Sequence, residues 1–242
     1  MNRATRLLLT AVTWLALLVG AQSAMAYGHI GTRSSGNVDY NGGPVSRSMT
    51  GIVVDWGDNI NPVYTDETTG DPGLIKYLAA NSGSTGDIGG VLAQYMDNTG
   101  HNAANVVSYG GQSTITPSAA NSGTTLTDPE IQNELVKQIE SGSLPHPAGN
   151  GLQTIYLVLF PSGDTECLDN AATQCSGTVF CAYHNNTLLS DGTNVLYAVL
   201  PDNTSGAMLQ GCGPAGSEPF GDQTSFLSHE WSEAITDPTG QA

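Results

Sequence analysis

The stretch Thr154-Ile-Tyr-Leu-Val-Leu-Phe160 decides the fold class of this chain. It is a short, almost continuous apolar run rich in β-branched and aromatic residues, which predicts a strand rather than a helix. Because both alternating sets of side chains are apolar, both faces of this strand should be buried. We therefore expect residues 154–160 at the centre of a sheet.

The segments around this strand predict the rest of one domain. Further strands are expected at 51–56, 178–184 and 194–200, with 104–109 as a candidate edge strand. Helices are expected at 74–78, at 88–95 and, most clearly, at 128–142, where Asp128 is the expected cap and Pro129 occupies the first turn. Strands and helices alternate without regular βαβ spacing, so we predict a mixed-sheet α/β domain over residues 51–242.

The first 26 residues predict export. Arg3 and Arg6 precede an apolar run over 7–19, and Ala24-Met25-Ala26 ends the segment. This is the pattern of a secretory signal peptide cleaved after Ala26, and the run is too short for the alternative, a permanent membrane anchor. We expect a secreted or periplasmic protein in which residues 27–50 form an extended lead-in.

The charge balance excludes two classes of partner. The chain has 6 Lys+Arg against 22 Asp+Glu and a formal net charge of −16. Removal of the signal peptide takes two basic residues, which leaves 4 against 22, near −18. Nucleic acids and anionic membranes are bound largely through Lys and Arg, so neither is an expected partner.

Four cysteines lie in the exported part and predict two disulfides. They are Cys167, Cys175, Cys181 and Cys212. Four cysteines allow three pairings and the sequence does not choose among them, although we favour 167 with 175 and 181 with 212. A zinc site made of all four is disfavoured because the chain lacks a CxxC pair.

The last predicted helix carries the pattern that suggests chemistry. It runs from a cap at Asp222 to the stop at Thr236-Asp237-Pro238. His229 and Glu233 are one turn apart, and Glu230 lies beside them on the expected polar face. This HExxE arrangement resembles the HExxH of zinc peptidases, so His229 and Glu233 are candidate zinc ligands and Glu230 the candidate general base. The alternative is a solvated acidic face with an ordinary i,i+4 pair.

The segment Ser228-His-Glu-Trp-Ser-Glu-Ala-Ile-Thr-Asp-Pro238 resembles the HExxE helix of the EXORDIUM (phosphate-induced protein) family and its secreted bacterial relatives. Other pieces match that family in the same order over most of residues 40–238, and they are Gly42-Gly43-Pro44-Val45, Trp56-Gly57, the helix at 128–142, Leu144-Pro145, the segment 156–161 and Phe180-Cys181-Ala182-Tyr183-His184. The resemblance implies a secreted, zincin-like domain with His229, Glu230 and Glu233 in its site. It does not imply a firm activity.

The third metal ligand is not evident from the sequence. Family members continue past the Asp-Pro stop with an acidic stretch that is a natural source of a ligand, whereas this chain ends at Ala242, so we expect either that the sequence is a fragment or that the site is incomplete. His184 is the weak candidate, since a core or strand-capping role is more common for such a histidine. Asp237 is expected to end the helix rather than bind metal.

Two functions and a second cation site follow as expectations. The leading function is a zinc-dependent metallopeptidase acting on extracellular peptides or proteins, and the alternative is a non-catalytic, EXORDIUM-like binding or signalling protein associated with cell-wall glycan. A calcium site is conceivable in the acidic loop of Asp55, Asp58, Asp66, Glu67 and Asp71. Their spacing fits no calcium loop, so a solvated loop is favoured.

Overall fold

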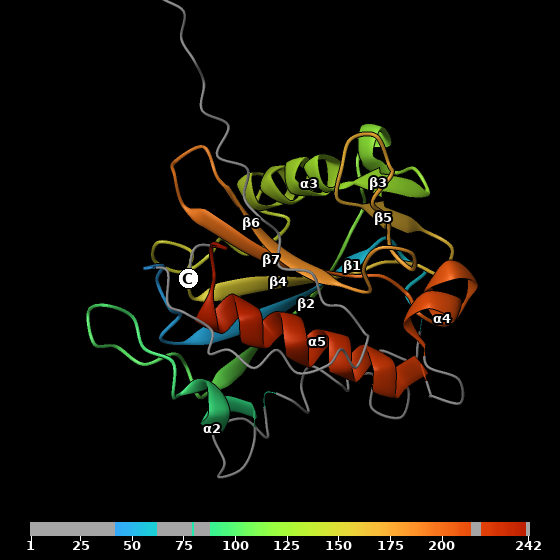
Figure 1. Cartoon of the computed structure of the whole chain (residues 1–242). Coiled ribbons are helices and arrows are strands. Elements are labelled where there is room, and N and C mark those ends of the chain that lie inside the picture. Colours follow the sequence, from blue (N-terminus) through green and yellow to red (C-terminus); the bar gives the residue numbers. More distant parts are fainter. Residues whose placement is uncertain (1–41, 62–78, 80–87, 214–218, 241–242) are drawn as a thin grey trace, which may run out of the picture.

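The protein is built around one five-stranded sheet (Figure 1). The computed structural model describes residues 42–61, 79, 88–213 and 219–240. The strand order is β2-β1-β4-β7-β6, where β1 is Met49–Trp56, β2 Val107–Ile115, β4 Thr154–Leu159, β6 Tyr183–Leu188 and β7 Asn194–Leu200. Neighbouring strands are parallel except β6, which is antiparallel to β7 at the edge. The predicted mixed-sheet α/β class is thus confirmed.

Strand β4 occupies the middle of this sheet, as its sequence predicts. All six of its residues are buried. Alternate side chains enter two separate cores: Ile155 and Leu157 lie in one, and Tyr156 and Val158 in the other. This division is the period-two alternation of a strand that is covered on both faces.

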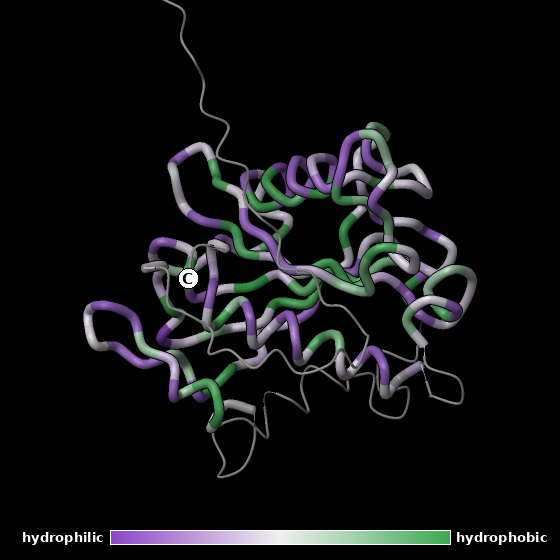
Figure 2. Tube along the Cα trace, viewed as in Figure 1, coloured by the Kyte–Doolittle hydropathy of each residue, from purple (hydrophilic) through white to green (hydrophobic). Residues whose placement is uncertain are grey.

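Two helices cover the two faces of the sheet. Helix α3, Asp128–Glu140, lies over one face, and helix α5, Pro219–Thr236, lies over the other (Figure 1). Figure 2 shows hydrophobic residues concentrated in the strands between these helices. The remaining elements are short: α2 Ile88–Leu92, a 3₁₀ turn Ala119–Asn121, the small parallel pair β3 Thr125–Thr127 and β5 Thr165–Cys167, and α4 Gly206–Cys212.

The strand expected at 178–184 is wrong except for its last two residues. The main chain turns at 175–180, where the N–H groups of Thr178 and Val179 both donate to the carbonyl of Cys175. The strand begins only at Tyr183 and continues through polar residues to Leu188. An edge strand needs few apolar side chains, so hydrophobicity alone places it too early.

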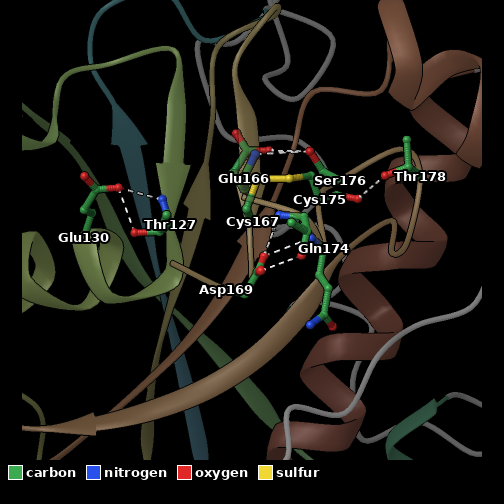
Figure 3. Close-up of a disulfide and its surroundings, with 10 residues drawn as sticks. Thr127, Glu130, Glu166, Cys167, Asp169, Gln174, Cys175, Ser176 and Thr178 are labelled. Atoms are coloured by element: carbon green, nitrogen blue, oxygen red, sulfur yellow. Dashed lines mark hydrogen bonds between the residues drawn. A yellow bond between two sulfur atoms is a disulfide. The ribbon is translucent and has the colours of Figure 1, made fainter. Parts of the chain in front are cut away.

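Both predicted helix caps differ from the structure. Thr127, not Asp128, caps α3 and shares a capping box with Glu130, which Figure 3 shows. Asp128 instead lies buried and accepts hydrogen bonds from the hydroxyls of Tyr183 and Tyr197. Helix α5 begins at Pro219, so Asp222 lies in its first turn.

Three amino-terminal segments differ from the bounds that the sequence predicts. The candidate edge strand exists as β2 but runs further, to Ile115, and order starts before Gly51, since Ser46 is buried and its N–H donates to the carbonyl of Ile235. Helix α2 ends at Leu92, shorter than expected. The signal peptide and the helix expected at 74–78 lie outside the described residues.

The two disulfides of the favoured pairing are present. Cys167 is bonded to Cys175 (Figure 3) and Cys181 to Cys212. Disulfides of this kind are typical of exported proteins. Among the described helices, none has the length and apolarity needed to cross a membrane.

Candidate metal centre

Helix α5 lays the HExxE segment against the sheet. Leu227, Trp231 and Ala234 are buried in the core beneath it. Gly51 of β1 permits this close packing, because a Cβ atom there would lie 3.1 Å from the Trp231 ring. The motif is therefore held on a rigid element.

Glu230 lies on the buried side of this helix, which corrects the expected polar face. Its side chain is 0% exposed, whereas those of His229 and Glu233 are 46% and 31% exposed. Glu230 follows Leu227 by three residues, and residues three apart share a helix face. The three motif residues are thus graded from inside to outside: Glu230, Glu233, His229.

Strand β6 brings His184 to the motif. His184 pairs in register with Ala198 of β7, which belongs to the core under α5, so the imidazole points toward that helix. Its Nδ1 atom lies 3.4 Å from Oε2 of Glu230 and 3.3 Å from Oε2 of Glu233. The side chain of His184 is only 3% exposed.

The donor atoms of these three side chains converge at ion-pair distances but make no well-aligned hydrogen bond with one another. The ligand atoms of His184, Glu230 and Glu233 all lie within 4.8 Å of one another. Yet Nδ1 of His184, both oxygens of Glu230 and Oε2 of Glu233 are buried and make no well-aligned hydrogen bond in the described structure. Buried polar atoms without partners are costly and uncommon, and they call for an explanation.

The spacing of the donors fits a zinc ion. Zinc bonds to nitrogen and oxygen are about 2.0–2.2 Å long, so neighbouring ligand atoms of a tetrahedral centre are about 3.3 Å apart. The two distances from Nδ1 of His184, 3.4 and 3.3 Å, match this value. One imidazole and two carboxylates also form a donor set that zinc accepts.

The end of α5 orients the imidazole. Nε2 of His184 lies 3.3 Å from the carbonyl oxygen of Asp237. In its neutral form, with the proton on Nε2 donated to this carbonyl, the ring would present the lone pair of Nδ1 to a cation held between it and the carboxylates. Asp237 thus contributes through its backbone, and its carboxylate is not a member of the converging group.

The pKa values of His184, Glu230 and Glu233 depend on both their burial and their mutual contacts. Burial opposes a charge on His184, but its polar contacts with Glu230 and Glu233 outweigh that effect and raise the pKa of the imidazole to about 9. Burial raises the pKa of Glu230. At Glu233 burial acts in the same direction, but contacts with both imidazoles prevail and lower its pKa to about 2. Without a metal the charge on Glu233 is therefore balanced by protonated histidine.

His229 is the one sequence-predicted ligand outside this group. Its Nε2 atom lies 3.0 Å from Oε1 of Glu233, whereas His184 contacts Oε2 of the same carboxylate. The hydrogen bond to Glu233 raises the pKa of His229 despite partial burial. The structure therefore joins His229 to Glu233, but His229 is not a member of the converging group.

The sequence gives only a weak indication that His184 belongs to the site. The HExxE spacing carries no information about a strand 40 or more positions upstream, and a histidine among apolar residues usually belongs to a core. The available signal was the segment Phe180–His184, which resembles a family piece.

Among the residues named for a calcium loop, Asp55 is buried in β1 and accepts hydrogen bonds from Gln112 and Thr114. Residues 66, 67 and 71 lie outside the described residues.

Comparison with known proteins adds no assignment to this geometry. No protein-family model, curated protein or solved structure matches the chain.

Proposed function

We propose that the chain is a secreted zinc-binding protein of the zincin type that works as a metallopeptidase. The observation that carries the proposal is the convergence of buried donor atoms from His184, Glu230 and Glu233, which make no well-aligned hydrogen bond and have the spacing of a zinc centre. The substrates we envisage are extracellular peptides or proteins.

The graded exposure of the motif suits a site that opens to solvent on one side. Zinc, when bound, lowers the pKa of a coordinated water and polarises a carbonyl group. Glu230 and His184 would hold the ion from the closed side, because both are shielded from water. Glu233 and His229 lie on the exposed side, where a peptide can approach.

The proposal assigns Glu230 as a ligand, whereas the motif by itself favours a base. Its carboxylate is enclosed and one oxygen faces Nδ1 of His184, which suits coordination better than proton transfer at an open position. The ligand set expected from the motif, His229 and Glu233 with Glu230 as general base, stays a prediction. The two ligand sets differ in the histidine that the metal requires, His184 in one and His229 in the other.

Zinc content of the purified, signal-cleaved protein tests the proposal. Wild type should retain zinc after mild chelator washing, as measured by elemental mass spectrometry. His184→Gln should lose it. His146→Ala serves as the matched control, because its side chain is 52% exposed and it lies outside the site. Circular dichroism and thiol counting establish that each variant is folded and oxidised.

Activity is assayed separately on denatured protein substrates. Zinc-dependent cleavage that His184→Gln abolishes supports a peptidase. Retention of zinc without cleavage, together with retention on cell-wall glycan, favours the non-catalytic binding protein. Zinc-free wild type overturns the proposal as a whole.

A further inference from the structure

The carboxylate of Glu233 lies between two imidazoles. Its Oε2 atom is 3.3 Å from Nδ1 of His184, and its Oε1 atom is 3.0 Å from Nε2 of His229. The two oxygens therefore contact different imidazoles, of which His184 is 3% exposed and His229 is 46% exposed. A carboxylate whose two oxygens each contact a different potential metal ligand has the arrangement of a bridging ligand.

The two histidines cannot share one ion as they stand. The donor atoms that lie within 4.8 Å of one another belong to His184, Glu230 and Glu233, and His229 is not among them. His229 and Oε1 of Glu233 form a separate donor pair, whose nitrogen-to-oxygen distance of 3.0 Å would have to lengthen to about 3.3 Å to admit one zinc ion. The ligands predicted from the motif and those assembled by the fold thus share only Glu233.

We propose that the centre binds two divalent cations bridged by Glu233. The inner ion is held by His184, Glu230 and Oε2 of Glu233, and the outer ion by His229 and Oε1 of Glu233 with water completing its coordination. Bridged pairs of this kind, about 3.5–4 Å apart, are an established arrangement in hydrolytic centres. This inference rests on the proposed function for its inner ion.

The outer position should bind more weakly than the inner one. It has two protein ligands rather than three, and His229 is 46% exposed, so water competes for the ion. The charge of the chain acts in favour of a second cation, since a formal net charge of −16 attracts cations and offsets part of the repulsion between two ions.

Isothermal titration calorimetry measures how many zinc ions bind to each chain and so distinguishes one bound ion from two. Zinc titrated into metal-free wild type should give two equivalents, with the second bound at least 10-fold more weakly. His229→Ala should keep the tight equivalent and lose the weak one, while His146→Ala keeps both. Glu233→Ala should lose the weak equivalent and weaken the tight one.

Electron paramagnetic resonance of the manganese-loaded protein tests the bridge itself. Two Mn²⁺ ions joined by one carboxylate give a spin-coupled spectrum, which His229→Ala should replace with the signal of isolated Mn²⁺. A single equivalent in wild type that persists in His229→Ala overturns the second ion and leaves the proposed function intact. Two uncoupled ions overturn the bridge, and no bound ion overturns both proposals.

Discussion

Nδ1 of His184 lies 3.4 Å from Oε2 of Glu230, although one residue is on an edge strand and the other on the carboxyl-terminal helix. Both side chains are shut off from solvent. Such a contact is expensive unless something balances its charge, since burying ionisable groups without good hydrogen bonds costs several kcal/mol. Protonated His184 supplies that balance without a metal, and a divalent cation would replace its proton. The proposed function rests on this relationship.

Glu230→Gln distinguishes a ligand from a general base. As a ligand, Glu230 should contribute at least as much as the partners that orient ligands, whose loss costs about 10–100-fold in metal affinity. We therefore expect at least a 10-fold loss of zinc affinity, measured by competition with a chelating dye. Unchanged affinity combined with lost peptidase activity would restore Glu230 to the role of base.

Zinc affinity should rise with pH. The raised pKa of His184, about 9, means that the ring is protonated at neutral pH in the metal-free protein, and zinc must displace that proton. Between about pH 6 and 8 the affinity should therefore increase by roughly tenfold per pH unit for the one proton released. Titrations in buffers of different ionisation enthalpy count the released protons, and a pH-independent affinity would contradict the assignment of His184.

The two disulfides should differ in their effect on the metal centre. Cys181 lies three residues before His184, and its bond to Cys212 spans a separation of 31 residues. The double variant Cys181→Ala/Cys212→Ala should lose about 4 kcal/mol of stability on the loop-entropy estimate and also bind zinc more weakly.

The other disulfide provides the control for that experiment. Cys167 and Cys175 are separated by 8 residues, so their replacement by alanine should cost about 2.5 kcal/mol and leave zinc affinity unchanged. Denaturant unfolding and zinc titration measure the two effects. Equal zinc affinity in both double variants would show that the Cys181–Cys212 bond does not position His184.

Glu166 should make the protein less stable at alkaline pH. Burial raises its pKa to about 8, although Ser176 donates a hydrogen bond to its Oε2 atom (Figure 3). The folded pKa lies above the unfolded value near 4.5, so the stabilisation is complete below pH 4.5 and is lost as pH rises toward and past 8. Glu166→Gln should remove this slope and gain a few kcal/mol at pH 9 relative to wild type.

Unfolding in denaturant at pH 5 and pH 9 checks this dependence. Asp58→Asn is the matched control, because that acid is exposed and its replacement should leave the slope unchanged. An equal slope in wild type and Glu166→Gln would show that the buried carboxyl does not govern the alkaline loss of stability.

The fold was predictable where apolar patterning is continuous. The central position of β4 and the buried stripe of Leu227, Trp231 and Ala234 follow from the spacing of their side chains. The start of β6 does not, because an edge strand with Asn185 and Asn186 has no apolar pattern to mark it. Local hydrogen bonding at the Cys175 turn decides where that strand begins.

The site was only half predictable for a related reason. Helical spacing alone joins His229 to Glu233, and that pair is present. The depth of Glu230 depends on how α5 is rotated against the sheet, and the contribution of His184 depends on the register of β6 with β7. Both are properties of tertiary packing, which a single motif does not encode.

A crystal structure of the zinc-soaked protein, with data collected on both sides of the zinc absorption edge, tests the central claim most directly. We expect the anomalous peak of a zinc ion about 2.0–2.2 Å from Nδ1 of His184, Oε2 of Glu230 and Oε2 of Glu233. A zinc ion bound only at His229, or no anomalous peak between His184 and α5, would contradict it.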